Sequence, residues 1–453
     1  MGLDLNVRDI EMLDQHTEGW ITGLYLSAIS LRNHEDPGDF IRHFTSGHHY
    51  ILDYLTDEVL QKQPDDLQAF LMHTSIVPRL SGALCDAVTD RTDSHTILDQ
   101  LYHQNLFVSA LDDSHLWFRY HPLLADLLRS HLHQTTPAAE IRSRYLRASV
   151  WCEKKGSWDT AISHAIKAAD WVRTADLVAN SYHPLISQGR VTTWQRWIDQ
   201  LPEASIQASL PLQIRRGWTA FLNGQVKKAE AMLTDARQAL LSLPPTPELR
   251  ALRGELATYL ANVLFFHEDS ATIIEMAEEA LVFLPPDQVV ARARATGTLG
   301  LGVSLAGDTR RAMDLYHATV ELARSAGNPF FLAHALEVVV DGLYHTGQLH
   351  AAAETSREII DLGASEGTTP LPFAGNGHIK LAGIYIEWQE LEKAREHLER
   401  GFALCRYGGI GYNSLQDHCT EVRLLHALGD DEGALAALRR AEGVFRAGRS
   451  RIM

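Results

Sequence analysis

The sequence predicts a mainly α-helical protein in which a small winged-helix domain precedes a right-handed α-solenoid. Two patterns and the composition support this fold class. A short glycine and alanine motif recurs roughly every 40 residues in the C-terminal half, and the first half offers short helices followed by an alternating apolar and polar stretch. The chain has 453 residues, of which 22% are charged. This is enough for two or three domains with large cores.

The recurring motif is Gly-x-x-x-x-Ala, with four full copies and two degenerate ones. The copies stand at Gly224/Ala229, Glu268/Ile273, Gly307/Ala312, Gly347/Ala352, Gln389/Ala394 and Gly429/Ala434. Their starts lie 44, 39, 40, 42 and 40 residues apart. Such a period is typical of stacked helix pairs. We expect each glycine to end the first helix of a pair in a left-handed turn, and each alanine to begin a closely packed second helix.

Other positions keep the same register around each turn. A small or β-branched residue stands seven positions before it, at Gly217, Ala261, Gly300, Val340, Ala382 and Val422. Nine positions after it stand Leu233, Ala277, Tyr316, Leu398 and Leu438, with Ser356 as a local weakness. This spacing resembles the tetratricopeptide repeat, lengthened from about 34 to about 40 residues.

A winged-helix domain is expected over residues 46–135. Residues 51–72 read as one or two amphipathic helices, with Pro64 in the first turn of the second. After Pro78, SGALCDAVT and SHTILDQLYHQ each offer a short helix. The following NLFVSALDDSHLWFRYHP alternates around Asp112-Asp113-Ser114, which indicates a β-hairpin.

The charge balance argues against nucleic acid as a direct partner. The formal net charge is −16, and residues 46–135 hold five Lys or Arg against twelve Asp or Glu. Such a domain repels phosphates, so its role is expected to be intramolecular. A basic last turn, with Arg439, Arg440, Arg446, Arg449 and Arg451, is interpreted as an exposed helix face and tail.

Several other classes of protein are disfavoured by the sequence. It has no run of 18 apolar residues, so no membrane span is expected. Four cysteines without a Cys-x-x-Cys pair fit a reducing, cytoplasmic location. His48-His49, His131-x-His133 and His418-Cys419 each lack a second ligand pair, so no metal site is expected. No catalytic arrangement stands out, and we expect no enzymatic activity.

Five stretches of the first half carry a family resemblance. They are TEGWITGLYLSAISL (Thr17–Leu31), DPGDFIRHFTSGHHYILDYLTDEVLQKQP (Asp36–Pro64), FLMHTSIVPRLSGALCDAV (Phe70–Val88), NLFVSALDD (Asn105–Asp113) and RYHPLLADLLRSHL (Arg119–Leu132). These stretches resemble the middle of the MalT-like, ATP-dependent regulators of the LuxR class, which are signal-transduction ATPases with numerous domains. In that family a nucleotide-binding domain is followed by helical and winged-helix regions, a superhelical repeat sensor and a C-terminal helix-turn-helix.

The 453 residues lack two sequence features of that family. They contain no Gly-x-x-x-x-Gly-Lys-Ser/Thr loop for phosphates and no terminal basic helix-turn-helix. The chain therefore resembles a regulator cut at both ends, and whether it is an excised piece, a truncated gene product or a natural stand-alone protein is left open. We expect no cofactor in this chain, and ATP or ADP only in a full-length regulator.

The resemblance implies nucleotide contacts for three residues when a nucleotide-binding domain is present. Gly19 and Trp20 lie where the family has a Gly-x-Pro segment beside the base and sugar, although Ile21 replaces the proline. His121, in Arg119-Tyr120-His121, matches the winged-helix histidine that contacts the ADP phosphate in resting members. The alternative for His121 is a structural role between the wing and the next helix.

Resemblance and repeats together predict four segments and a ligand groove. Residues 1–45 are expected to end the nucleotide-binding and helical region, 46–135 to form the winged helix, 136–205 to form connecting helical hairpins and 206–453 to form the superhelical sensor. In the sensor, polar and aromatic residues on the free face of the first helices are candidate ligand contacts. They are Asn262, Phe265, Glu337, Asp341, Tyr344, His345, Arg423 and His426. A solvated surface is the alternative.

These expectations lead to one preferred function and one alternative. The preferred function is the regulatory core of a MalT-like transcriptional regulator, which binds a small-molecule inducer or a protein or peptide in the groove and controls self-association. Direct binding to nucleic acid or membranes is not expected. The alternative is a stand-alone tetratricopeptide-like scaffold that binds a protein or peptide.

Overall fold

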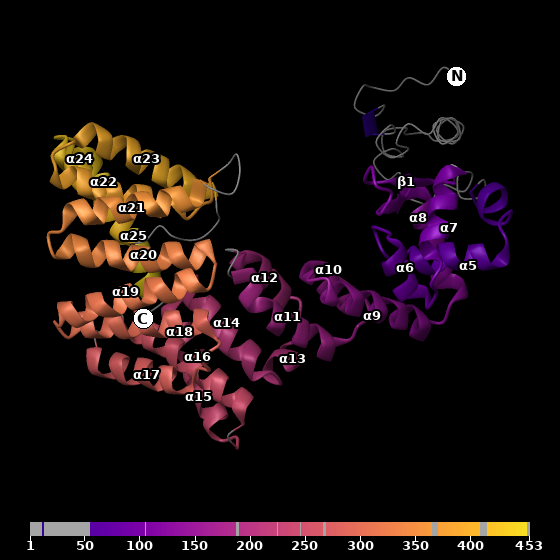
Figure 1. Ribbon diagram of the computed structural model, residues 1–453, viewed down its shortest axis with the longest axis horizontal. Helices are drawn as coiled ribbons and strands as arrows, with labels where there is room; N and C mark the ends of the chain where they lie inside the picture. Colours follow the sequence, from indigo (N-terminus) through magenta and orange to yellow (C-terminus); the bar gives the residue numbers. More distant parts are fainter. Residues whose placement is uncertain are drawn as a thin grey trace. The chain divides into compact units, whose positions relative to one another are not determined.

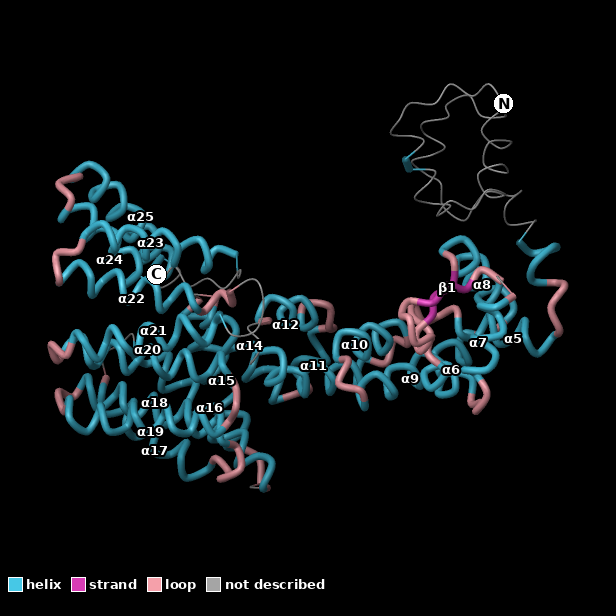
Figure 2. Tube along the Cα trace, turned by 45° about the horizontal axis from the view of Figure 1, so that its top comes forward, coloured by secondary structure: helices cyan, strands magenta, loops and turns pink. Residues whose placement is uncertain are grey.

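The protein consists of two compact units, Met1–Leu177 and Val178–Met453. The structure is a computed structural model that describes residues 11–12, 55–104, 106–186, 190–223, 225–244, 246–265, 269–364, 370–407 and 415–450. Helices account for most of this part of the chain, and its strands lie in the first unit (Figures 1 and 2). The predicted domain boundaries at residues 45, 135 and 205 stay predictions.

The first unit has the element order of a winged helix. Its elements are η1 (Leu55–Leu60), α5 (Asp65–Thr74), α6 (Gly82–Thr89), α7 (Ser94–His103), β1 (Val108–Ala110), β2 (Phe118–Tyr120), α8 (Pro122–Thr135), α9 (Ala138–Lys154) and α10 (Trp158–Lys167). β1 and β2 are antiparallel, with Val108 opposite Tyr120, and Leu80 adds an isolated bridge to Phe118. The winged-helix fold is therefore confirmed.

Asp112 shapes the turn of the predicted hairpin. Its Oδ1 accepts hydrogen bonds from the backbone amides of Leu116 at 2.8 Å and Trp117 at 3.3 Å. Beneath the hairpin, the hydroxyl groups of Tyr120 and Thr74 lie 2.6 Å apart, which ties β2 to α5 inside the core. An aspartate in the turn and an aromatic residue in the strand explain why this short sequence folds as a hairpin.

The second unit is built of consecutive helix pairs. Helix α11 (Trp171–Ile186) crosses the boundary between the units, and α12 (Val191–Ile198) and α13 (Glu203–Gln207) follow. The pairs are α14 (Leu210–Leu222) with α15 (Val226–Leu241), α16 (Pro247–Leu264) with α17 (Ser270–Phe283), α18 (Val289–Leu305) with α19 (Thr309–Ser325), α20 (Pro329–His345) with α21 (Leu349–Ala364), α22 (Ala374–Glu387) with α23 (Leu391–Tyr407), and α24 (Leu415–Ala427) with α25 (Asp431–Ser450).

The first helices of these pairs, α14, α16, α18, α20, α22 and α24, form a continuous column. Each packs on its own second helix, and each except α24 also packs on the next first helix along the chain. Neighbouring helices run antiparallel in the stack (Figure 1). Among the described residues, successive second helices make fewer contacts with each other. Because elements on the inner side of a curved stack lie closest together, the first helices line the inner side, as in tetratricopeptide solenoids.

The backbone at the repeated turns confirms the role predicted for glycine. The φ angle is positive at Gly307 (91°), Gly347 (75°) and Gly429 (80°), and the degenerate copy Gln389 adopts the same conformation at 61°. Gly224 and Glu268 lie outside the described residues. A left-handed residue at each turn allows the chain to reverse direction within a few residues.

The column of small residues is explained by the side chains that face it. A Cβ atom built on Gly300 would lie 2.7 Å from Cε1 of Tyr316, which stands nine residues after the turn. A Cβ atom on Gly217 would lie 2.9 Å from the Leu233 side chain in the same way. The last repeat differs, because Leu438 is 49% exposed and Ala437 is buried instead.

A further copy of the motif was missed by the sequence reading. Gly156, with a φ angle of 71°, connects α9 to α10, and Ala161 five residues later is fully buried. This copy has the same Gly-x-x-x-x-Ala spacing. Its distance from the next copy does not fit the period of about 40 residues, so the period alone could not reveal it.

Substitution of Gly300 tests the packing of the repeats. We expect Gly300→Ala to lower the free energy of unfolding by about 1–3 kcal/mol, because its Cβ atom overlaps the buried Tyr316 ring. The matched control is Gly297→Ala on the same helix, where the nearest atom is 3.4 Å away. That change is expected to stabilise the helix by about 0.5–1 kcal/mol. Urea unfolding of both variants measures the difference, and equal effects would contradict the predicted packing.

Candidate ligand cavity

A cavity of about 830 Å³ lies in the second unit, among α11, α14, α16, α18 and α20. Apolar side chains, including Leu249, Leu252, Val289, Val290 and Phe331, form much of its wall. Its polar lining includes His183, Arg215, Glu255, Thr258, Tyr259 and Arg294, together with Glu248, Asp287, Gln288 and Asn328. A mostly apolar cavity with a few convergent polar groups is the usual form of a small-molecule site.

Local sequence signals start the helices that line the cavity. The Thr246 hydroxyl caps α16 by accepting from the Leu249 amide at 3.3 Å, and Pro247 occupies the first turn. Likewise, the Asn328 side chain caps α20 by accepting from the Phe331 amide at 3.1 Å. Side-chain caps followed by proline fix where a helix begins. The first turns of α16 and α20 therefore present Leu249 and Phe331 to the cavity.

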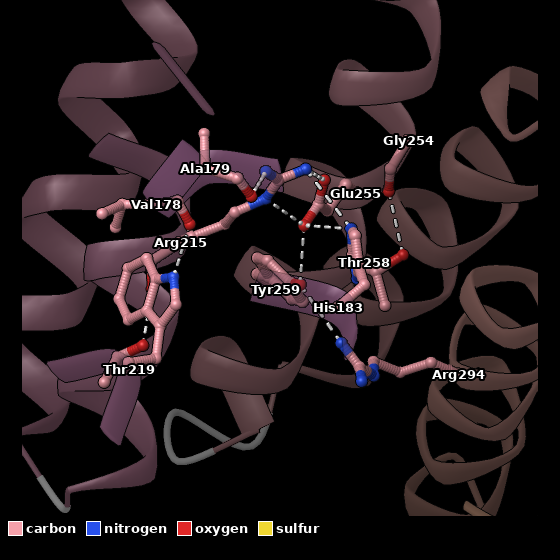
Figure 3. A network of polar contacts seen from close by, with 11 residues as sticks. Val178, Ala179, His183, Arg215, Thr219, Gly254, Glu255, Thr258, Tyr259 and Arg294 are labelled. Atoms are coloured by element: carbon pink, nitrogen blue, oxygen red, sulfur yellow. Dashed lines mark hydrogen bonds and ion pairs between the residues drawn. The ribbon is translucent and has the colours of Figure 1, made fainter. Parts of the chain in front are cut away.

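A chain of polar contacts joins several of the residues that line the cavity (Figure 3). Arg215 contacts both carboxylate oxygens of Glu255 at 3.3 Å, and its Nη1 donates to the Ala179 carbonyl oxygen at 2.6 Å. The Tyr259 hydroxyl donates to Glu255 Oε1 at 2.8 Å and accepts from Arg294 Nη1 at 3.2 Å. The network therefore links α18, α16 and α14 to the backbone of α11.

Charges in this network are set by burial and by pairing. Burial alone raises the pKa of Glu255, but Arg215, His183 and the bond from Tyr259 outweigh it and lower this pKa to about 2. Burial, together with Arg215 and Arg294, lowers the pKa of His183 to about 4 against the opposing effect of Glu255. At neutral pH, Glu255 is therefore charged and His183 is neutral.

Aromatic rings hold the Arg294 guanidinium at the cavity wall. Its central carbon lies 5.7 Å from the Trp218 ring centroid, 5.6 Å from that of Tyr259 and 5.3 Å from that of Phe331. Trp218 and Tyr259 are stacked with centroids 4.4 Å apart and an angle of 9° between the rings. Within the described part of the chain, no carboxylate lies within ion-pair distance of Arg294.

The residues predicted to bind a ligand connect neighbouring first helices instead of lining this cavity. Asn262 Nδ2 donates to Thr298 Oγ1 at 2.8 Å, from α16 to α18. Between α20 and α22, Glu337 accepts from Asn376 at 2.8 Å and Asp341 pairs with Lys380 at 2.7 Å. Phe265 follows the end of α16. Glu337 also lines a crevice of about 20 Å³, which is too small for a ligand.

The remaining predicted ligand residues lie farther along the column. Tyr344 donates to Glu387 Oε1 at 2.6 Å, and Arg423 from α24 pairs with the same carboxylate. The exposed His345 ring lies 5.7 Å from the Tyr344 ring. His426 lies 2.9 Å from Asp431 at the surface. The structure thus brings Tyr344 and Arg423 together through Glu387, a residue that the sequence reading missed, and the ligand-binding role of the set stays a prediction.

Of the predicted nucleotide contacts, only His121 lies among the described residues. It precedes α8, and its Nδ1 accepts from the Leu123 amide at 3.3 Å. Its ring lies 6.0 Å from the Phe107 ring. This position between the wing and α8 agrees with the structural alternative, and the nucleotide contact remains a prediction. Gly19 and Trp20 lie outside the described residues.

Two repeat positions that the sequence analysis did not consider supply polar residues of the cavity. Arg215 and Tyr259 stand nine positions before the turn of their repeat, and Glu255 and Arg294 stand thirteen before it. Both positions lie on the face of the first helix that carries the predicted groove residues, one or two turns nearer its start. If the predicted groove is extended to these two repeat positions, it includes charged and aromatic residues of the cavity.

The described residues lack two further features, a metal-binding cluster and a membrane-spanning helix. No group of three or more His, Cys, Asp or Glu side chains there is arranged to hold a metal ion. A helix with the length and apolar character needed to span a bilayer is also lacking in this part of the chain.

Each of the two units contains a match to a known protein family. Residues 56–140 match the family described as the MalT winged helix domain, and residues 254–453 match the MalT-like TPR region. The two matches lie on either side of residues 141–253, which include part of the cavity wall.

The relatives that match most of this chain are longer proteins. The chain is 26% identical to the serine/threonine-protein kinase PknK of Mycobacterium tuberculosis, over 96% of this chain and 39% of that protein. It is also 26% identical to the HTH-type transcriptional regulator MalT of Yersinia enterocolitica, over 89% of this chain and 45% of that protein. The chain thus spans less than half the length of these curated relatives.

A solved structure with the same fold comes from Pyrococcus horikoshii. It is a signal-transduction ATPase with numerous domains that has a tetratricopeptide repeat sensor. The alignment covers 93% of this chain and 72% of that chain, with a TM-score of 0.59 and 14% identity. At this identity the similarity concerns the fold alone.

Proposed function

Because the chain has the winged-helix domain and tetratricopeptide-repeat region of the MalT-like regulators, we propose that it is the regulatory and sensor portion of a MalT-like LuxR-family transcriptional regulator. In this role the column of first helices binds an inducer, and binding controls self-association. The observation that carries the proposal is the cavity of about 830 Å³ in that column. Its volume lies in the range of roughly 300–1,000 Å³ that is usual for small-molecule sites.

The proposed mechanism couples the cavity to α11. Arg215 lines the cavity and holds the Ala179 carbonyl oxygen of α11, a helix that begins in the first unit. A ligand that favours one arrangement of α14, α16 and α11 shifts the equilibrium toward it. We propose a closed form, in which the acidic winged helix packs on the nucleotide-binding domain of a full-length regulator, and an open form that self-associates.

Two sets of predicted residues fit into this proposal. Asn262, Asp341, Tyr344 and Arg423 extend the ligand surface along the column of first helices when the inducer is longer than the cavity. His121, with Gly19 and Trp20, contacts ADP only in a regulator that contains a nucleotide-binding domain. The winged-helix match makes a regulator a better explanation than a stand-alone scaffold.

Blocking the cavity tests the proposed function. The purified chain is screened by thermal shift against sugars, amino acids, carboxylic acids, peptides and nucleotides, and hits are measured by calorimetry and by light scattering for self-association. Ala326→Trp places a large ring in the cavity wall, whereas the neighbouring Ser325→Trp lies on an exposed position outside the lining. We expect ligand binding to fall at least about tenfold in Ala326→Trp, because the ring takes the space of the ligand.

The two tryptophan variants serve as test and control. Ser325→Trp should bind like the unchanged chain. If Ala326→Trp also retains full affinity for every hit, the cavity is not the ligand site. If no compound binds and self-association never changes, the sensor function is wrong.

A further inference from the structure

Arg294 has donor capacity that the described protein does not use. A guanidinium has five N–H donors, and the structure shows one hydrogen bond from Arg294, at 3.2 Å to the Tyr259 hydroxyl. Each of its side-chain nitrogen atoms is either hydrogen-bonded or reached by solvent. The guanidinium lines the cavity. Its remaining donors therefore open onto the cavity, where a ligand can accept from them.

The nearby charges do not balance Arg294. Glu255 already pairs with Arg215 through two contacts of 3.3 Å, and their side chains are only 10% and 12% exposed. His183 is neutral at pH 7 because its pKa is lowered to about 4, with burial as the largest cause. The inner wall thus carries one more positive charge than negative charges. A partly buried guanidinium gains most from a bidentate acid group.

Two other carboxylates belong to the rim and are screened by water. Glu248 is exposed in the first turn of α16, where its pKa is lowered by its own backbone amide and by Thr246. Asp287 is exposed in the loop before α18. Charges in water interact weakly across several ångströms, so these two acids oppose an anion at Arg294 only slightly.

The apolar wall defines the rest of the ligand. Leu249, Leu252, Val289, Val290 and Phe331 line the same cavity as Arg294. Burial of apolar ligand surface against them contributes roughly 25 cal/mol per Å². A fully hydrated anion, or a sugar covered with hydroxyl groups, would leave this wall without a matching surface.

We propose that the cavity binds an organic carboxylate with an apolar body, whose carboxylate accepts hydrogen bonds from the Arg294 guanidinium. The proposal rests on the proposed function in taking the cavity as the ligand site. The acid group pairs with the one cavity cation that has no carboxylate partner among the described residues, and the apolar body packs on Phe331 and the valine and leucine wall. A free carboxylic acid and the C-terminus of an apolar peptide present the same chemistry.

Matched acids and amides test the charge requirement. The probes are 4-phenylbutyrate with 4-phenylbutyramide, and acetyl-Val-Leu-Phe with a free or an amidated C-terminus, each titrated calorimetrically into the full chain. In at least one pair the acid should bind about tenfold or more tighter than its amide, as expected for a charge-assisted pair. The pair that shows this preference identifies the source as a free acid or a peptide.

Substitution of Arg294 assigns the preference to this residue. In Arg294→Met the acid and the amide should bind within about twofold of each other, because the charge and its donors are lost. Arg311→Met removes one positive charge from the exposed surface of α19 and should leave the preference unchanged. Equal binding of acid and amide by the unchanged chain, absence of binding by both acids, or a preference that survives in Arg294→Met would each overturn the proposal.

A second measurement uses the unchanged chain, so it does not depend on folding of the variant. Phenylglyoxal modification of Arg294, followed by mass spectrometry, should be slowed by the bound acid and not by its amide. Equal modification with and without the acid would overturn the proposal. If only neutral compounds bind, and Ala326→Trp abolishes their binding, the carboxylate assignment fails while the proposed function stands.

Discussion

Glu255→Ala is expected to lower the free energy of unfolding by about 3–5 kcal/mol, the usual cost of removing one partner of a buried ion pair. The substitution leaves the Arg215 guanidinium, which is 12% exposed, without its carboxylate, and it removes the acceptor of the Tyr259 hydroxyl. Urea unfolding of the full chain, together with hydrogen exchange of the α14 and α16 amides, measures the loss and locates it in these two helices.

The control for Glu255 is an ion pair at the surface. Glu358→Ala breaks the 2.8 Å contact with Arg324, where the two side chains are 40% and 47% exposed. Its cost is expected to stay below about 1 kcal/mol because both charges remain in water. If Glu255→Ala costs no more than Glu358→Ala, the buried network does not stabilise the stack.

A double substitution separates the two energetic terms of the pair. Arg215→Met with Glu255→Leu replaces both charges by apolar side chains of similar size, so neither position of the pair leaves an uncompensated buried charge. The double variant should recover most of the stability lost in Glu255→Ala. Failure to recover would mean that the bonds to Ala179 and Tyr259, rather than the bare Arg215 charge, dominate the loss.

The repeats could be predicted because their contacts obey a fixed register within one pair of helices. Gly300 meets Tyr316 sixteen residues later, and Gly217 meets Leu233 at the same separation. The turns also require a residue with a positive φ angle, and glycine at that position marks this requirement in the sequence. Even Gln389, with no glycine, takes the turn conformation with a φ angle of 61°, because the packed helices on both sides impose it.

The cavity was harder to predict because its contacts join different repeats. Arg215 and Glu255 are 40 residues apart, and Tyr259 and Arg294 are 35 apart. The period shows that such residues belong to neighbouring helices, but small rotations of each helix decide which side chains meet. The predicted groove residues illustrate this limit, since Asp341 meets Lys380 and Tyr344 meets Glu387 in bonds that the columns did not specify.

The second large effect concerns acid sensitivity and rests on His164 of α10. This ring is 1% exposed and neither nitrogen has a hydrogen-bond partner, while the Tyr145 ring lies 5.8 Å away. Burial and the nearby positive charge of Lys167 lower its pKa to about 4. The unfolded chain takes up the proton near the ordinary value of 6.5, so the unfolded state binds more protons between these two pH values.

Because the unfolded state binds more protons in this range, the free energy of unfolding falls as the pH falls. The contribution of neutral His164 is fully present above pH 6.5 and is lost as the pH falls toward 4. The loss is at most about 1.4 kcal/mol per pH unit. His164→Leu removes the titrating group and two unsatisfied nitrogen atoms at similar volume. We expect it to change stability by less than about 1 kcal/mol at pH 8 and to flatten the decline at lower pH.

An exposed histidine provides the matched comparison for His164. His133 lies in the last turn of α8 and its side chain is exposed. His133→Leu leaves the buried His164 ring in place, so this variant should lose stability with falling pH as the unchanged chain does. Urea unfolding at several pH values between 4 and 8, with hydrogen exchange of the α9 and α10 amides, measures both variants. If the stability of His164→Leu falls with pH as steeply as that of the unchanged chain, the His164 ring does not drive acid unfolding, because the variant has no titrating group at that position.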